Sequence, residues 1–314
     1  MYSKKVVLGL LLSVVGVQAA IPKIPGYKVT WSDDFNGHAD TLPDPNNWII
    51  DLGTSYPGGP ANWGNGEAQT YTDDIENLRV NGKGNLLITA IKNSTGDWTS
   101  ARIETQRTDF MAQPGGKMRI QADLKVPSLG DRGIGYWAAF WTLGAEFRGN
   151  YWNWPSIGEM DIMENVNNLD RVWGVLHCGT NPGGPCNESN GLGDSRPCAG
   201  ASCAGNFHTY AIEVDRTASP ETLSWFVDGA MYHQVNETAL PEKVWEQTVH
   251  SPHFILLNMA IGGGFPSGLH GGPTPLNTTA SGGRYEIRYV AVYNSIGQKH
   301  DSSIEVSISA AIGK

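Results

Sequence analysis

Residues 158–165 read GEMDIMEN and carry three carboxylates, Glu159, Asp161 and Glu164. Side chains alternate between the two faces of a β-strand, so Glu159 and Asp161 share one face and the apolar residues between them face the core. In a regular strand Glu164 would turn to the core face, where an unpaired carboxylate is costly. One additional residue near Met163 restores the parity. The odd spacing therefore predicts a β-bulge that returns Glu164 to the acidic face.

Two glutamates on one face of a concave sheet can flank a bond held between them. A carboxyl separation near ~5 Å suits a retaining glycosidase, with one nucleophile and one acid/base. Asp161 adds a charge that can share a proton with Glu159 and raise the pKa of its neighbours. The alternatives are a solvated acidic edge and a calcium site. Calcium favours acids on a loop with carbonyl ligands, whereas these acids follow a strand rhythm, so the pattern favours catalysis.

The rest of the chain predicts an all-β fold. Short runs alternate apolar and polar residues and are separated by turn-forming clusters, as half-buried strands require. Residues 223–233 predict a hairpin that turns at Asp228-Gly229, and only residues 240–248 have a helical pattern. Regular strands and turns favour a β-sandwich or jelly roll. The expected strands are 27–35, 85–92, 101–107, 117–126, 136–143, 172–177, 208–215, 253–261 and 285–294.

The N-terminus has the order of a secretory signal peptide. Lys4 and Lys5 precede the apolar run VVLGLLLSVVGV, which small residues follow. A membrane anchor is the alternative, but the run is too short to span a bilayer comfortably. We therefore expect a signal peptide at residues 1–20, a single catalytic domain at 21–314, and a secreted, monomeric protein that has no membrane contact after cleavage.

The chain is acidic, with a formal net charge of −9. Cleavage after residue 20 would remove two lysines and no acids, which gives −11. Such a protein repels phosphate backbones, which argues against nucleic acid as a partner. A neutral or cationic substrate is expected instead.

Four cysteines lie within 26 residues, and four sequons are spread along the chain. In a secreted chain, this even number predicts two disulfides, for which three pairings are possible. A zinc site is the alternative, but the spacings lack a C-x2-C pair. The asparagines of the sequons are predicted to face solvent. The residues are Cys178, Cys186, Cys198 and Cys203, and Asn93, Asn187, Asn236 and Asn277.

The stretch GEMDIMENVN resembles the signature of glycoside hydrolase family 16, in the bulged E-x-D-x-x-E form typical of endo-1,3-β-glucanases (laminarinases). The resemblance implies a concanavalin A-like jelly-roll sandwich whose concave sheet forms the substrate cleft. It covers nearly the whole chain after the signal peptide. Ten segments follow the order of the family: 31–37, 62–72, 76–90, 100–106, 135–144, 174–179, 207–215, 225–229, 254–263 and 289–294.

The resemblance also implies roles for individual residues. Glu159 matches the nucleophile, Glu164 the acid/base, and Asp161 the residue that assists the nucleophile. His177 matches a histidine on the neighbouring strand, for which a structural role is the alternative. The positions that match substrate-binding residues are Trp137, Trp141, Trp154, His177, Asn65, Glu67 and Arg102.

One departure concerns a metal. Many members of the family bind a structural calcium through an aspartate of the last strand, and Arg288 stands at that position here. A cation opposes calcium, so we expect no metal and no cofactor. The expected activity is retaining hydrolysis of internal 1,3- or mixed 1,3/1,4-β-glucosidic bonds, with β-glucan as the partner. The alternatives are a 1,3-galactanase, a glucan transglycosylase and a non-catalytic carbohydrate-binding protein.

Overall fold

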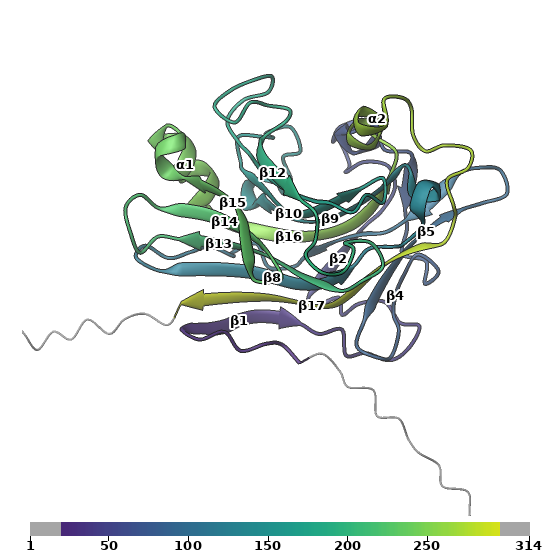
Figure 1. The fold of residues 1–314 in the computed structure, drawn as a ribbon, viewed down its shortest axis with the longest axis horizontal. Coiled ribbons are helices and arrows are strands. Elements are labelled where there is room, and N and C mark those ends of the chain that lie inside the picture. Colours follow the sequence, from purple (N-terminus) through teal and green to yellow (C-terminus); the bar gives the residue numbers. More distant parts are fainter. Residues whose placement is uncertain (1–19, 296–314) are drawn as a thin grey trace, which may run out of the picture.

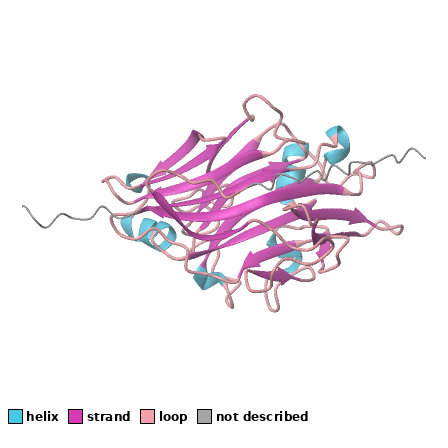
Figure 2. Ribbon diagram, turned by 90° about the horizontal axis from the view of Figure 1, so that it is seen from below, coloured by secondary structure: helices cyan, strands magenta, loops and turns pink. Residues whose placement is uncertain are grey.

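The computed structural model describes residues 20–295, which form two β-sheets packed face to face. In Figure 1 the sheet that contains β9, β10 and β16 lies above the layer formed by β8, β17 and β1. Strands extend through the whole described body, and short helices lie around its rim (Figure 2). The predicted all-β jelly-roll class is confirmed. The predicted signal peptide falls, except for its last residue, outside the described residues.

The smaller sheet has seven antiparallel strands and carries the acid triplet near its centre. β10, which carries the triplet, lies between β9 and β11. These two neighbours confirm the strands expected at 136–143 and 172–177. The strand order is β12 (Leu192–Arg196), β11 (Val172–His177), β10 (Glu159–Val166), β9 (Tyr136–Gly144), β16 (His253–Ile261), β7 (Arg102–Thr105) and β2 (Trp48–Asp51).

The larger sheet has ten strands and supports the smaller one from behind. All of its pairs are antiparallel except β3 with β6. Its path is β15 (Ala230–Asn236), β14 (Thr222–Val227), β13 (His208–Asp215), β8 (Lys117–Lys125), β17 (Gly283–Ser295), β5 (Leu86–Lys92), β6 (Trp98–Ser100) and β3 (Gln69–Tyr71), with β1 (Tyr27–Asp33) on β17 and β4 (Leu78–Val80) on β5.

The local predictions outside the triplet were correct, but they omitted one α-helix and five strands, β2, β3, β4, β6 and β12. β14 and β15 form the expected hairpin, and both turn residues, Asp228 and Gly229, have positive φ. The predicted helix is α1 (Glu242–Val249). A second helix, α2 (Gly264–His270), was not predicted, because its glycines and proline are poor helix formers. Within residues 20–295, no helix combines the length and apolarity that a membrane span needs.

One continuous apolar core fills the space between the sheets. On β10 the core receives Met160, Ile162 and Met163, each at most 1% exposed. Full burial of one such side chain contributes about 1.5–3 kcal/mol. The core therefore fixes which side of β10 faces inward and leaves the opposite side for the acids.

The four cysteines pair sequentially, Cys178 with Cys186 and Cys198 with Cys203. Both disulfides lie in the segment around β12, next to β11. The prediction of two disulfides is confirmed, and the structure selects one of the three possible pairings.

Candidate active site

The predicted β-bulge is present in the middle of β10. Asp161 lies opposite Trp141 of β9, and the next paired residue, Met163, lies opposite Phe140. Ile162 is therefore the extra residue. As a result Glu164 returns to the same face of the sheet as Glu159 and Asp161, as the spacing predicted.

The second sheet anchors the bulge from behind. The indole Nε1–H of Trp225, on β14, donates a hydrogen bond of 2.7 Å to the main-chain oxygen of Asp161. A buried carbonyl without a partner would cost about 1–3 kcal/mol. The indole can reach this carbonyl only because residue 174 on β11 is glycine: a Cβ atom there would lie 2.4 Å from Trp225 Cδ1. Gly174 and Trp225 together therefore hold the bulge in place.

All three acids line one cavity on the open face of the smaller sheet. Asp161 and Glu164 are 4% and 7% exposed, and Glu159 is half-buried. Six of the seven predicted substrate-binding residues line the same cavity, and the seventh, His177, lies beside Glu159 on β11. The six are Trp137, Trp141, Trp154, Asn65, Glu67 and Arg102.

Two tryptophans fix the glutamates by donating hydrogen bonds. Trp154 Nε1 donates to Glu159 Oε2 over 3.1 Å, and Trp137 Nε1 donates to Glu164 Oε1 over 2.8 Å. Each indole donates to only one oxygen of its glutamate. The second oxygen of each carboxyl group therefore remains available for chemistry. The indole rings form part of the cavity wall, where flat apolar surfaces suit the faces of sugar rings.

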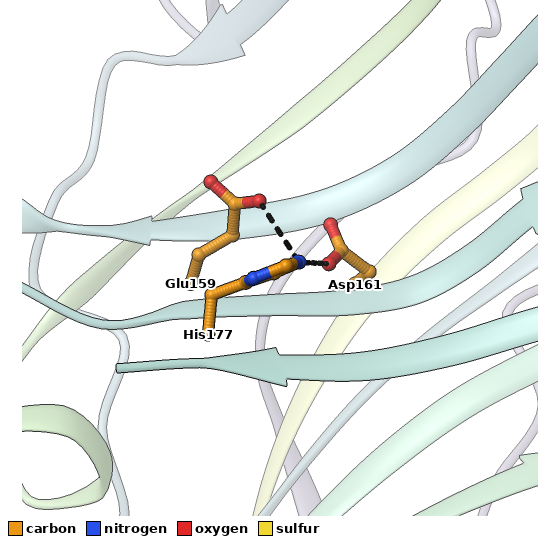
Figure 3. Close-up of side chains that lie close together, drawn as sticks. All are labelled: Glu159, Asp161 and His177. Carbon is orange, nitrogen blue, oxygen red and sulfur yellow. Dashed lines mark ion pairs between the residues drawn. The ribbon is translucent and has the colours of Figure 1, made fainter. Parts of the chain in front are cut away.

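His177 connects the first two acids (Figure 3). Its Nε2 atom lies 3.3 Å from Asp161 Oδ2 and 3.9 Å from Glu159 Oε1. The contact with Asp161 is an ion pair without hydrogen-bond alignment, and Asp161 Oδ2 is buried with no hydrogen-bond partner among the described residues. This oxygen faces the Nε2 edge of the imidazole and can accept a hydrogen bond from it or from a substrate hydroxyl.

The environment holds Glu164 in its protonated form at neutral pH. Burial, followed by repulsion from Asp161, raises the pKa of Glu164 to about 8, although the hydrogen bond from Trp137 acts in the opposite direction. A carboxyl group with such a pKa can serve as a general acid near neutral pH.

Glu159 and His177 influence each other's protonation. Burial and repulsion from Asp161 raise the pKa of Glu159, whereas His177 lowers it. For His177, burial favours the neutral ring, but contacts with Asp161 and Glu188 outweigh it and raise the pKa of the imidazole well above its usual value. The net effect raises the pKa of Glu159, and the positive charge on His177 is the contribution that acts toward the carboxylate form, which nucleophilic attack requires.

One wall of the cavity is built around a buried cation. Arg102 donates from Nε to Asp51 over 2.9 Å, and its guanidinium group lies 4.6 Å from the ring centre of Trp63 and 4.9 Å from that of Trp141. Arg102 is 4% exposed. This packing orients both indole rings and leaves the guanidinium little freedom.

A hydrogen-bond chain joins Trp141 of β9, the strand next to β10, to Glu67. Trp141 Nε1 donates to Asn258 Oδ1, Asn258 Nδ2 donates to the hydroxyl of Tyr71, and that hydroxyl donates to Glu67 Oε2. Glu67 also accepts a hydrogen bond from Asn65 Nδ2 over 3.2 Å. Asn65 and Glu67, predicted from separate positions, therefore belong to one connected network.

Several residues at the site were not predicted. Tyr56, Trp63 and Tyr151 reach the cavity from irregular segments, and Glu188 reaches His177 from the segment before β12. Neither strand periodicity nor the resemblance assigned these positions. Tyr56 stacks on Tyr151 with 4.2 Å between the ring centres. This contact depends on the tertiary fold and cannot be predicted from the local sequence.

The remaining predictions concern the glycosylation sequons and the calcium position. Among the sequon asparagines, Asn93, Asn187 and Asn277 are exposed, while Asn236 is half-buried. Arg288, which replaces the calcium-binding aspartate of the resemblance, forms an ion pair of 3.2 Å with Asp123. Glycosylation at the four sequons and the expected lack of calcium stay predictions.

Within residues 20–295, Glu159, Asp161 and His177 are the one group whose donor atoms lie close enough together, within 4.8 Å, to share a cation. When the imidazole is charged, however, both of its nitrogens carry protons that face carboxylates, and no lone pair is left for a metal. The donor set therefore fits a hydrogen-bonded ionisable cluster, and the expected absence of a cofactor stays a prediction.

Comparison with known proteins places this geometry in a family. The family model for the XgeA-like, catalytic GH16 domain matches residues 89–199, which include β10 and both neighbouring strands. A beta-glucanase of Rhodothermus marinus is 33% identical over 285 residues, which are 86% of this chain and 86% of that protein. The glucan endo-1,3-beta-glucosidase A1 of Niallia circulans is 30% identical over 87% of this chain, which spans 38% of that longer protein.

The structural comparison agrees. The crystal structure of the endo-1,3-beta-glucanase from Streptomyces sioyaensis superposes with a TM-score of 0.86 at 45% sequence identity, and the match covers 89% of this chain and all of that one. The bulged acid triplet, the cavity above it and these relatives lead to one conclusion: the chain belongs to glycoside hydrolase family 16.

Proposed function

We propose that this glycoside hydrolase is a secreted endo-β-glucanase that cleaves internal 1,3-β-glucosidic bonds, and mixed 1,3/1,4 linkages, with retention of configuration. The observation that carries the proposal is the bulge at Ile162, which places Glu159 and Glu164 on the wall of one cavity. The names of the relatives from Streptomyces sioyaensis and Niallia circulans support activity on 1,3-β-glucan.

The proposed mechanism is a double displacement. Glu159 attacks the anomeric carbon while protonated Glu164 delivers its proton to the leaving glycosidic oxygen, and a covalent glycosyl-enzyme forms. Glu164, now a carboxylate, takes a proton from water, which attacks the anomeric carbon and releases Glu159. His177 offsets the negative charge of Glu159 before the attack and after its release, and Asp161 lies between the two glutamates on the same face of β10.

The cavity wall supports a neutral sugar substrate. Trp137, Trp141 and Trp154 offer indole surfaces for ring faces, and Asn65 and Glu67 offer polar atoms for hydroxyl groups. Secretion is supported by the two disulfides, which persist in oxidising compartments.

Digestion with analysis of linkage and anomeric form tests this proposal. The enzyme is incubated with laminarin, lichenan and a 1,3-galactan, and early products are followed by proton NMR. We expect internal cleavage of laminarin and of lichenan, with β-anomers as the first products. Initial α-anomers would refute retention, and cleavage of the galactan alone would favour the galactanase alternative. Longer product chains at high substrate concentration would indicate a transglycosylase.

A further inference from the structure

Glu188 is a buried carboxylate that the mechanism above does not use. The residue is 6% exposed, and its side chain is completely inaccessible to solvent. One of its oxygens lies 2.7 Å from Nδ1 of His177, and the other accepts the main-chain N–H of Cys178 over 2.8 Å. Both oxygens are therefore held in place, and one of them is directed at the histidine of the catalytic cluster.

A short closed loop delivers this carboxylate. The disulfide between Cys178 and Cys186 ties the start of the loop to a point two residues before Glu188. Gly183 and Glu188 then exchange two main-chain hydrogen bonds, as in an antiparallel bridge. The covalent link and the bridge restrict the loop, so Glu188 has little freedom to leave His177.

The ionisable groups around the imidazole are all acidic. Glu159, Asp161 and Glu164 lie toward it from β10, and Glu188 lies on the opposite side of the ring. A buried carboxylate is costly unless a charged partner compensates for it. Protonated His177 can donate from Nδ1 to Glu188 while its Nε2–H faces Asp161, so one cation serves carboxylates on both sides.

We propose that Glu188 is a positioning residue for catalysis: held by the disulfide-closed loop, it fixes the orientation and the second proton of His177, so that the imidazolium faces Asp161 and Glu159. This inference rests on the proposed glucanase mechanism. Glu188 touches neither substrate nor reacting atoms and acts only through His177.

Replacement of Glu188 by glutamine changes the charge and keeps the shape. The amide oxygen can still accept the N–H of Cys178, and the amide N–H then faces Nδ1 of His177. This arrangement suits a neutral ring with its proton on Nε2. Glu159 loses the adjacent positive charge, so the acidic limb of the kcat–pH profile should move to higher pH.

The experiment is a double-mutant cycle on laminarin with Glu188→Gln, His177→Gln and the double variant. We expect Glu188→Gln to lower kcat about 10- to 100-fold, by analogy with the carboxylates that orient metal-ligating histidines, with KM nearly unchanged. In the His177→Gln background the same change should have no further effect. The control, Asp194→Asn, removes an exposed acid from the same segment and should behave as wild type.

Additive losses, a rise in KM alone, or an unshifted pH profile would overturn the proposal. Nitrogen NMR of His177 in the unmodified enzyme gives a readout that needs neither activity nor a variant. We expect both ring nitrogens to be protonated at pH 7, and a neutral ring there would refute the role of Glu188. An enzyme that does not cleave laminarin but has a charged His177 would contradict the proposed function and leave this arrangement standing.

Discussion

Replacing Glu164 by glutamine should stabilise the protein at neutral and alkaline pH while it removes the general acid. Burial raises the pKa of Glu164 from its ordinary value of 4.5 to about 8. Because the folded-state value is raised, the stabilising contribution of this group is complete below pH 4.5 and is lost as the pH rises through about 8. Glutamine has no such dependence, and its side-chain oxygen can still accept the Nε1–H of Trp137.

The magnitude follows from the size of the shift. One pH unit corresponds to about 1.4 kcal/mol, so glutamine should raise the free energy of unfolding by roughly 3 kcal/mol at pH 7 and roughly 5 kcal/mol above pH 8.

Urea unfolding of both proteins at pH 4.5, 7 and 9 measures this effect. The difference between Glu164→Gln and wild type should be small at pH 4.5 and should grow with pH. The control is Glu76→Gln, at an exposed position, for which the difference should not grow. A difference in unfolding free energy that is constant with pH, or that decreases as the pH rises, would refute the claim that Glu164 is protonated in the folded protein at neutral pH.

Three further predictions concern β10 and its two neighbouring strands, β9 and β11. Trp137→Phe removes a hydrogen bond that lowers the pKa of Glu164, so the alkaline limb of the kcat/KM–pH profile should move above its wild-type position. Glu159→Ser should abolish turnover of laminarin while calorimetry still detects binding of laminari-oligosaccharides. Gly174→Ala forces a Cβ atom against Trp225, so the free energy of unfolding, measured by thermal denaturation, should fall by about 1–3 kcal/mol. Activity should also fall, because the bulge shifts.

Each of these predictions has a control or a contradicting outcome. A pH profile unchanged by Trp137→Phe would mean that the indole does not influence the acid. Turnover by Glu159→Ser at the wild-type rate would remove the nucleophile from the mechanism. For the glycine, Gly268→Ala in α2 places a Cβ in open space and should be tolerated; equal effects at Gly174 and Gly268 would contradict the steric argument.

The sequence predicted the features that depend on local spacing. Parity along 159–164 required a bulge, because the alternative was a buried unpaired carboxylate, and the register of β10 against β9 has this bulge. The alternation of the other strands and the Asp228-Gly229 turn were read in the same way. In these segments, side-chain direction follows from sequence position alone.

Features that depend on long-range packing could not be predicted from spacing. Trp63 reaches the cavity because Arg102 packs against its ring, and Glu188 matters because a disulfide brings its loop back to His177. The helix α2 forms from residues with low helix propensity, so only its tertiary surroundings can account for it. Even the disulfide pairing required the fold, because three pairings were compatible with the spacing.

The central claim is that one bulged strand presents a nucleophile and an acid to the same sugar. Trapping the glycosyl-enzyme tests it most directly. The enzyme is treated with a 2-deoxy-2-fluoro-β-laminaribioside that carries an activated leaving group, then digested, and the labelled peptide is identified by mass spectrometry. The account predicts a single sugar adduct on Glu159. An adduct on Glu164 or Asp161, or full turnover of the reagent with no covalent species, would contradict it.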